Sequence, residues 1–230
     1  MRLDKFLSHA TRLSRTDARR AIKAGRVTLN DELARGSDQA VQPADRVMLD
    51  GERVAPPGLR YFMLHKPAGY ICATFDNDHP TVLDLLGDEG HGLSIAGRLD
   101  KDTTGLVLLS DDGAWIHAVI SPRRVCAKTY LATLDAEPDA ALVETFAQGL
   151  MLRGEQRPTR PAELVLQGDC QAQVMLHEGR YHQVKRMFAA CGLHVEALHR
   201  VRIGNIVLDP ELAPGEFRAL RPDEIKGIMA

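Results

Sequence analysis

Cysteine is scarce in this 230-residue sequence, and long apolar runs are absent. The four cysteines, Cys72, Cys126, Cys170 and Cys191, stand far apart and form no CxxC pair, so neither a disulfide framework nor a thiolate zinc site is indicated. No stretch approaches the ~18 consecutive apolar residues that a membrane span needs. Residues 1–5 open an amphipathic pattern instead of a signal peptide. We therefore expect a cytoplasmic protein with reduced thiols and no membrane partner.

The composition is typical of a globular protein. Hydrophobic residues make up 44% and charged residues 26% of the chain, with 12 Pro and 19 Gly, which excludes the fibrous and disordered classes. The length is ~1.5 times that of a typical domain, so two units are expected. The only Pro/Gly-rich run between patterned segments is Ala55-Pro56-Pro57-Gly58. A linker at about 55–60 then separates a predicted N-terminal domain, residues 1–58, from a C-terminal domain, residues 59–230.

The net charge of −2 conceals an uneven distribution of charge along the chain. The first 26 residues contain eight Arg or Lys and two Asp. The first 60 residues contain 12 basic and eight acidic groups, whereas the remaining 170 contain 17 and 23. A basic N-terminal segment on an acidic body indicates a polyanionic partner.

The basic N-terminal segment has the pattern of a helical hairpin. Apolar residues recur at spacings of three and four from Leu3 to Leu13, which predicts a first helix. Ser14 has the character of an N-cap, with Asp17 three residues later, and Gly25 would end the second helix. Short strands are expected at 27–29 and 47–49, separated by polar loops.

Basic residues spaced four apart share one side of the second helix. A solvated helix surface is the ordinary interpretation of such a face, but the excess of one sign without interleaved acids favours phosphate contacts. The candidate RNA-binding residues are Arg2, Lys5, Arg12, Arg15, Arg19, Lys23 and Arg26. The start Arg2-Leu3-Asp4-Lys5-Phe6-Leu7, the basic second helix and the later Gly25-Arg26-Val27-Thr28-Leu29-Asn30 resemble the S4 RNA-binding domain. This resemblance implies a small module that grips folded RNA.

Extended patterns dominate the rest of the chain. Strands are predicted at 61–65, 106–109, 128–134, 162–166, 171–177 and 195–201. Helices are predicted at 114–120, ended by Pro122, at 139–148, at 182–191, and after Pro222. Strands that outnumber helices without strict βαβ alternation indicate an α+β fold, in which helices pack on a mixed, largely antiparallel sheet.

The densest polar segment, residues 94–105, lies between two apolar stretches. A loop between strands places such side chains at a cleft rim, although the spacing alone is equally typical of a simple polar turn. Within it, Asp100-x-Asp102-x-Thr104 matches the Asp-x-Asp-x-Thr pattern of haloacid-dehalogenase-type phosphatases, which use magnesium. Gly97-Arg98 interrupts the apolar strand that such phosphatases have before the first Asp, and no parallel βαβ scaffold follows. A magnesium-dependent phosphatase is therefore the weaker alternative.

A longer string containing Asp100 agrees with a different family. Gly97-Arg98-Leu99-Asp100-x-Asp102-Thr103-Thr104-Gly105-Leu106 resembles the catalytic motif of RNA pseudouridine synthases, specifically of the branch typified by the synthase of the ribosomal small subunit. Further stretches agree in order and spacing, and the resemblance spans nearly the whole chain. The further matching stretches are Leu64-His65-Lys66-Pro67-Ala68-Gly69-Tyr70, Lys128-Thr129-Tyr130, 178–188 and 198–204.

The resemblance implies an isomerase that turns a uridine of ribosomal RNA into pseudouridine. The likeness to the small-subunit branch implies uridine 516 of 16S rRNA as the target. The reaction breaks the N1–C1′ glycosidic bond and joins C5 to C1′ without redox change, so no cofactor is expected. The implied partner is ribosomal RNA or a small-subunit assembly particle, and a monomer is expected. Sister enzymes that share every motif act on large-subunit RNA or on transfer RNA. The alternative from another class is an inactive S4-type RNA-binding or ribosome-assembly protein that kept the fold.

The resemblance also assigns roles to individual residues. Asp100 is the expected catalytic carboxylate, as nucleophile or as base toward the sugar. A carboxylate in a water-poor pocket needs a fixed cation to stay charged, and Lys185 matches the position that supplies it. Tyr130 matches the tyrosine that stacks on the flipped-out base, and Leu198 and Ile203 match apolar positions that close over it. On pattern alone, Lys185 would be a solvated helix lysine, and the other three would be core residues.

Arginines complete the predicted site. Arg98 resembles the arginine that fills the gap left by the flipped base. A second basic cluster suited to phosphates consists of Arg180, Arg186, Arg200 and Arg202. The sequence departs from the pattern at Lys101, which puts a cation beside the expected catalytic residue.

Histidines offer a competing metal interpretation. His177, His182, His194 and His199 include no i,i+4 pair on a helix, and interleaved Arg and Lys would repel a cation. We therefore predict no metal site.

Overall fold

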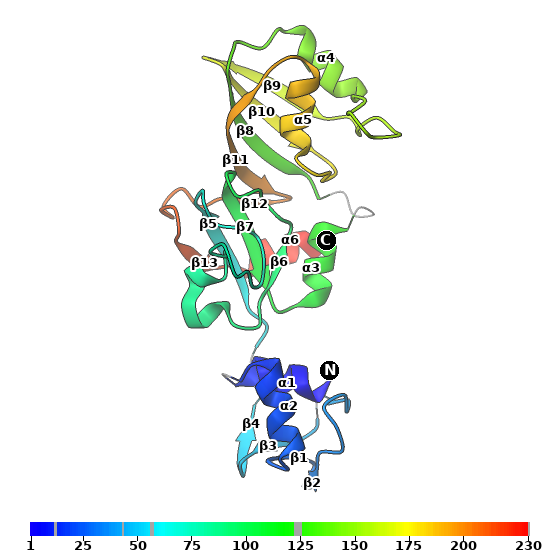
Figure 1. The fold of residues 1–230 in the computed structure, drawn as a ribbon, viewed down its shortest axis with the longest axis vertical. Helices are drawn as coiled ribbons and strands as arrows, with labels where there is room; N and C mark the ends of the chain where they lie inside the picture. Colours follow the sequence, from blue (N-terminus) through cyan, green and yellow to red (C-terminus); the bar gives the residue numbers. More distant parts are fainter. Residues whose placement is uncertain (12, 43, 56–57, 122–125, 230) are drawn as a thin grey trace. The chain divides into compact units, whose positions relative to one another are not determined.

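The structure is a computed structural model that describes residues 1–11, 13–42, 44–55, 58–121 and 126–229. The chain divides into two compact units (Figure 1). Unit 1 consists of Met1–Leu59 with Gly87–Leu93, and unit 2 consists of Arg60–Leu86 with Ser94–Ala230. Among the described residues, no helix has the length and apolarity required to cross a membrane.

Unit 1 begins with the predicted helical hairpin. Helix α1 spans Leu3–Ala10 and α2 spans Arg15–Lys23. The Ser14 hydroxyl accepts a hydrogen bond from the Asp17 backbone N–H at 3.1 Å, and Gly25 follows α2 in the left-handed region at φ 71°, so both predicted helix signals are confirmed. Helix α1 ends three residues before Leu13, because Thr11 is extended. The predicted RNA-binding residue Arg12 lies outside the described residues.

A four-stranded antiparallel sheet completes unit 1, in the order β2-β1-β3-β4. The predicted strands are confirmed as β1 (Val27–Leu29) and β3 (Val47–Leu49), and β2 (Glu32–Leu33) and β4 (Glu52–Val54) extend the sheet on either side. The core between helices and sheet contains Leu3, Phe6, Leu7, Ala18, Ala21, Ile22, Val27 and Val47. The apolar stripe predicted for the first helix is therefore its buried face up to Leu7.

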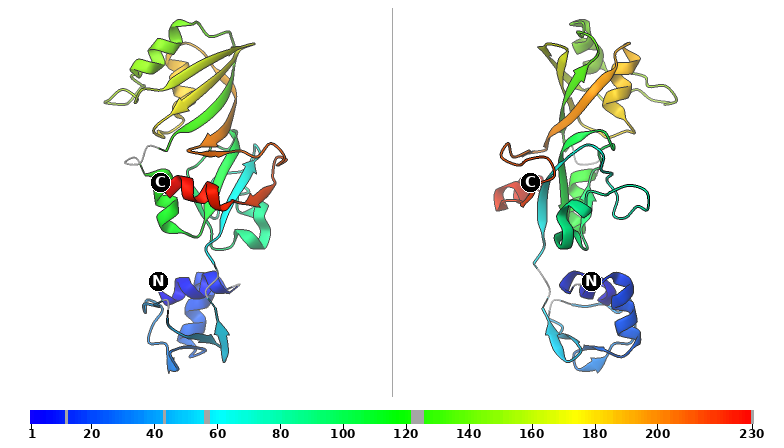
Figure 2. Two further views of the ribbon diagram at one scale, coloured as in Figure 1. Left: turned by 180° about the vertical axis from the view of Figure 1, so that it is seen from behind. Right: turned by 60° about the vertical axis from the view of Figure 1, so that its left-hand side comes forward.

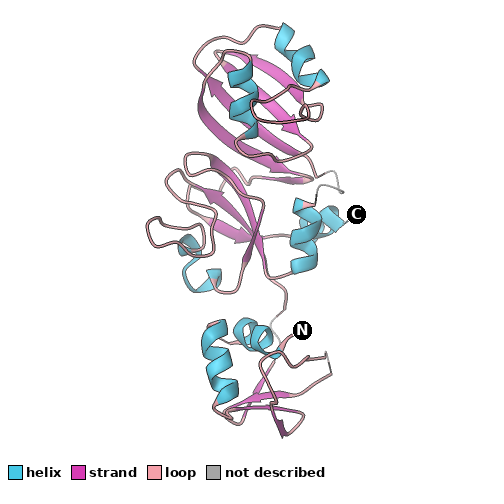
Figure 3. Cartoon of the chain, turned by 45° about the vertical axis from the view of Figure 1, so that its right-hand side comes forward, coloured by secondary structure: helices cyan, strands magenta, loops and turns pink. Residues whose placement is uncertain are grey.

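Unit 2 is built on a nine-stranded sheet (Figure 3). Its order is β13-β5-β7-β11-β8-β10-β9, with β12 paired to β11 and β6 paired to β7. All of these ladders are antiparallel except the parallel β7–β11 pair. The strands are β5 (Tyr61–Lys66), β6 (Ser94–Ala96), β7 (Thr104–Ser110), β8 (Lys128–Leu134), β9 (Glu163–Gly168), β10 (Gln171–Leu176), β11 (Val195–Ile203), β12 (Ile206–Val207) and β13 (Phe217–Ala219). The α+β prediction is confirmed.

Helices pack on this sheet at two places (Figure 2). Helix α3 (Gly113–Ile120) contacts β6, β7 and the last helix, α6 (Pro222–Met229). Helix α4 (Ala141–Gln148) packs on β9, and α5 (Gln183–Ala190) packs on β11. Two apolar cores result. One lies under α3 and α6 and includes Trp115, Ile203 and Ile228, and the other lies under α4 and α5 and includes Phe146, Phe188 and Leu198.

The predicted elements of unit 2 are confirmed, with ends shifted by at most three residues. The short strands β6, β12 and β13 and the 3₁₀ segment η1 (Asp84–Gly90) are not predicted by the sequence pattern. Each of these strands has only two or three residues, too few for alternation to be visible.

Candidate active site

Asp100 lies in the loop between β6 and β7, and a buried lysine forms hydrogen bonds to the backbone of this loop. Lys66, at the end of β5, is fully buried. Its ammonium donates to three carbonyl oxygens, of Thr103 at 2.7 Å, Pro67 at 3.0 Å and Lys101 at 3.3 Å. Burial lowers the pKa of Lys66, and the three carbonyls offset part of the desolvation cost of its charge. The loop backbone is thereby fixed on one side.

A buried arginine fixes the other side of the same loop. Arg200, on β11, is 1% exposed and donates to the carbonyls of Leu106 at 2.8 Å and of Arg98 and Gly97 at 3.3 Å each. The prediction that Arg200 binds phosphate is therefore wrong, because its guanidinium is used by the protein backbone. A Cβ at Gly105 would lie 2.3 Å from the Arg200 carbonyl oxygen, and Gly105 has φ +104°, so only glycine fits this approach.

Asp100 lies close to a histidine and a lysine side chain. His182 places Nε2 at 3.3 Å from Asp100 Oδ1, and Lys185 places Nζ at 3.9 Å from Asp100 Oδ2. The Lys185 ammonium is closer to Asp102, at 2.6 and 2.7 Å from its two oxygens, and this hydrogen bond lowers the pKa of Asp102. The sequence did not single out His182 as a partner of Asp100. Its position inside the 178–188 motif was the available signal.

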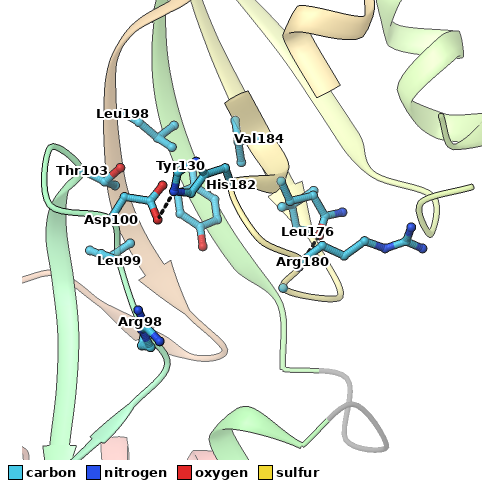
Figure 4. Close-up of a pocket in the computed structure, with 12 residues that line it drawn as sticks. Arg98, Leu99, Asp100, Thr103, Tyr130, Leu176, Arg180, His182, Val184 and Leu198 are labelled. Carbon is cyan, nitrogen blue, oxygen red and sulfur yellow. Dashed lines mark hydrogen bonds and ion pairs between the residues drawn. The ribbon is translucent and has the colours of Figure 1, made fainter. Parts of the chain in front are cut away.

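Asp100 lines a cleft to which strands, loops and helix α5 contribute side chains (Figure 4). The cleft holds about 400 Å³ of space, open solvent at its mouth included. The Asp100 carboxylate is 29% exposed, so it is accessible without being fully hydrated. The lining residues are Arg98, Leu99, Asp100, Thr103, Tyr130, Leu176, Gly179, Arg180, His182, Gln183, Val184 and Leu198.

The predicted base-binding residues are only partly brought together. Tyr130, on β8, is partly buried and lines the cleft, and the guanidinium carbon of Arg200 lies 6.0 Å from the centroid of its ring. Leu198 also lines the cleft. Ile203 does not: it is fully buried in the core under α3 and α6. The prediction that Ile203 closes over a base is corrected accordingly, because its side chain points into that core.

Two of the predicted phosphate-binding arginines are engaged by the protein itself. Arg180 donates to the carbonyls of residues 157 and 158 and pairs with Glu178 at 3.2 Å, and in Figure 4 its guanidinium points away from Asp100. Arg186 pairs with Glu155 at 3.0 Å and donates to the carbonyls of residues 153 and 181. Both anchor the segment around the cleft, and phosphate binding by either residue stays a prediction. Arg98 and Arg202 are exposed, and no described residue forms a side-chain hydrogen bond or ion pair with them.

In unit 1, a buried carboxylate organises the predicted basic surface. Asp4 is 0% exposed and accepts hydrogen bonds from Arg15 and Arg19 at 3.0 Å and from Arg2 at 3.2 Å. Burial raises the pKa of Asp4, but the hydrogen bonds from Arg19, Arg2 and Arg15 outweigh it and hold the pKa at about 2. The three arginine side chains remain about half exposed. We define Arg2, Arg15 and Arg19 as the arginine cluster.

The other predicted RNA-binding residues differ in their engagement. Lys23 is exposed at the end of α2, and Lys5 is half-buried on α1. Arg26 forms a bidentate pair with Asp50 at the surface, and the hydrogen bond raises the pKa of Arg26. Lys23 is therefore the most open of the three to an anion.

Two of the histidines lie close together. His65 and His199 meet edge to face at 5.4 Å between ring centroids, and His199 Nδ1 shares a hydrogen bond with the Thr104 hydroxyl at 2.8 Å. Burial lowers the pKa of His199, and the nearby His65 adds to the effect. Within the described part of the chain, His, Cys, Asp and Glu side chains form no group of three or more that could hold a metal ion.

Comparison with known proteins identifies the class to which this fold and cleft belong. Residues 60–190 match the RNA pseudouridylate synthase family, and residues 1–47 match the S4 domain. The chain belongs to the RNA pseudouridylate synthases and is therefore an isomerase. The family predicted from the motifs is confirmed, and neither the phosphatase nor the inactive-protein alternative is supported.

Particular relatives match over the entire chain. The chain is 49% identical over 231 residues to Ribosomal small subunit pseudouridine synthase A of Escherichia coli (strain K12), covering 100% of both proteins. It is 48% identical to the protein of the same name from Yersinia pestis, covering 100% of this chain and 99% of the relative. A crystal structure of a pseudouridylate synthase superposes with a TM-score of 0.73 at 42% identity, covering 99% of each chain.

Proposed function

We propose that this enzyme isomerises one uridine of 16S ribosomal RNA, uridine 516, with Asp100 as the catalytic residue. The observation that carries the proposal is the position of Asp100, which lies in an open cleft within reach of the His182 imidazole and the Lys185 ammonium. The choice of ribosomal RNA rests on full-length relatives named as small-subunit enzymes. We further propose that the substrate is this RNA, free or in an assembling small subunit, and that the enzyme acts as a monomer without a cofactor.

The chemistry requires an ionised carboxylate beside the sugar of the target. Either route, attack on the sugar or removal of a proton from it, starts from the charged form of Asp100. Desolvation by the incoming nucleotide would favour the neutral acid, and the Lys185 ammonium near the carboxylate opposes this. Because Lys66 and Arg200 fix the loop backbone, we expect the Asp100 carboxylate to keep its position when RNA enters.

The target base must leave its stack to reach the cleft, at a cost of a few kcal/mol. Tyr130 and Leu198 offer an aromatic and an aliphatic surface that would receive the base, and the Tyr130 hydroxyl would be available for proton transfer at C5. Arg98, exposed beside the cleft, would occupy the space left in the RNA. The arginine cluster of unit 1 and Lys23 would hold the RNA outside the cleft through its phosphates.

Replacing Asp100 with Asn tests the proposal. Tritium release from 16S rRNA labelled at C5 of uridine should disappear in the Asp100→Asn variant, while RNA affinity stays within a few-fold of the wild type. Asp223→Asn is the matched control, because Asp223 is an exposed acid outside the cleft. A wild-type enzyme that releases no tritium from any ribosomal RNA or subparticle would refute the activity. Mapping of pseudouridine in RNA from cells lacking the enzyme decides the target: loss at a different nucleotide replaces uridine 516.

A further inference from the structure

An exposed tyrosine stands beside the cleft and is stacked on a residue that contacts Asp100. The rings of Tyr181 and His182 have centroids 3.8 Å apart and planes inclined by 18°. Tyr181 is 76% exposed, although a tyrosine ring is large and mostly apolar. Its neighbours Arg180 and His182 both line the cleft. A single exposed aromatic residue is ordinary in a protein, but one stacked on a ligand of the catalytic carboxylate is not explained by the fold.

Hydrogen bonds hold the Tyr181 segment in place. The Arg186 guanidinium donates to the Tyr181 carbonyl at 3.1 Å. Two residues after Tyr181, the Gln183 side chain accepts a hydrogen bond from the Arg180 backbone N–H at 2.9 Å. His182 itself adopts the left-handed conformation, φ 48° and ψ 37°, which is uncommon for a residue with a side chain and is typical of functional positions. Little conformational freedom would therefore be lost if a ligand ordered this segment further.

We propose that Tyr181 is a stacking platform for a nucleobase that flanks the target uridine in the RNA. One face of the ring is covered by His182, and no other described ring stacks on it, so a third ring can extend the stack on the open face. Nucleobases are the rings that a substrate RNA brings to this position, since nucleotides next to the target stay attached to it when it enters the cleft. The proposal rests on the proposed function for its choice of ligand.

The platform has a second consequence through His182. Its ring contacts the Tyr181 ring on one side, and its Nε2 lies 3.3 Å from Asp100 Oδ1. A base that stacks on Tyr181 therefore restrains the side chain that pairs with the catalytic carboxylate. The identity of the flanking base matters little, because every base has a π face, so we expect a contribution to affinity more than to sequence choice.

Binding and turnover measured on matched variants test the platform. Loss of one base–aromatic stack corresponds to roughly fivefold to a hundredfold weaker binding. We expect Tyr181→Ala to show this loss in affinity for a short single-stranded RNA with a central uridine, and to raise KM for 16S rRNA more than it lowers kcat. Tyr181→Phe should retain wild-type affinity, since it keeps the ring. Val165→Ala, which trims an exposed apolar side chain on β9, is the control and should change neither value.

Fluorescence reports the stack directly. The same short RNA with 2-aminopurine on the 5′ or the 3′ side of the uridine should lose fluorescence on binding the wild type and Tyr181→Phe, and less on binding Tyr181→Ala. Unchanged affinity and unchanged quenching in Tyr181→Ala would overturn the platform, as would a fall in kcat alone. The binding arm needs no turnover, so an inactive wild type would refute the proposed function while quenching that depends on Tyr181 would still support the platform.

Discussion

Replacing Asp4 with Asn should destabilise unit 1, although the two side chains have nearly the same shape. Asp4 is completely buried and accepts hydrogen bonds from three arginines. An Asn side chain offers one carbonyl oxygen, and its amide group is itself a donor that faces guanidinium donors. The arginine cluster then consists of three cations around a neutral, mismatched group.

The pKa of Asp4 sets the size of the effect. Its value falls from 3.8 to about 2 on folding, which corresponds to about 2 kcal/mol of stability in the ionised state. Because the arginines are about half exposed, solvent screening reduces this to roughly 1–2 kcal/mol. A carboxyl with a lowered pKa stabilises the fold fully above its unfolded pKa, and that contribution is lost as pH falls from about 3.8 toward 2.

Amide hydrogen exchange in the β1–β3 ladder of the full-length chain measures unit 1 alone, since a global melting curve would mix the two units. At about pH 7, the Asp4→Asn variant should exchange faster by the factor that corresponds to roughly 1–2 kcal/mol. The difference between wild type and variant should shrink below about pH 4. Asp38→Asn, an exposed acid of unit 1, is the control. Equal protection at neutral pH, or a difference that stays constant down to about pH 2, would refute the reasoning.

Three further predictions follow from the contacts in the structure. Gly105→Ala should lower the free energy of unfolding by at least ~3 kcal/mol in urea titration, because the added Cβ meets a backbone oxygen at 2.3 Å, whereas Gly113→Ala has open space and should change it by less than ~1 kcal/mol. Arg202→Gln should flatten the salt dependence of RNA binding by about 0.7–0.9 in log–log slope, whereas Arg186→Gln should leave the slope unchanged and lower stability by about 1–3 kcal/mol, since its partners are carbonyls and Glu155. An unchanged slope in both would remove Arg202 from the RNA contact. A triple variant of the basic face of α2, with Arg15, Arg19 and Lys23 changed to Gln, should also show a flatter salt dependence of RNA binding. An unchanged log–log slope would mean that this face does not touch RNA.

The sequence predicted the elements whose signals are local. Alternating apolar residues over seven positions located β8 without error, and the Ser14 cap located the start of α2. The motifs around Asp100 and at 178–188 carried the resemblance to the family, and that resemblance predicted that Lys185 lies near Asp100, from which it is 3.9 Å away. Local patterns therefore sufficed for the long elements.

The sequence could not predict which charged residues are buried. Lys and Arg side chains are exposed in most proteins. The sequence therefore indicated no structural role for Lys66, and it indicated phosphate binding for Arg200. Their burial depends on carbonyl groups of a loop that is remote in sequence from β11. The burial of Asp4 could not be predicted for the same reason, since Arg15 and Arg19 of α2 reach its carboxylate only when the two helices pack. Ile203 was assigned to the base because it matches an apolar position of the family, and such a match does not show whether the side chain faces the cleft or the core.

The parallel pairing of β7 with β11 has a consequence for the order of events during synthesis. Arg200 is contributed by a strand near the end of the chain, and it completes the backbone support of the loop that holds Asp100. A nascent polypeptide that ends before β11 lacks this support. By that stage all the strands of the four-stranded sheet of unit 1 have already been synthesised. The backbone support of the Asp100 loop is thus completed late in translation, after the strands of unit 1 have been made.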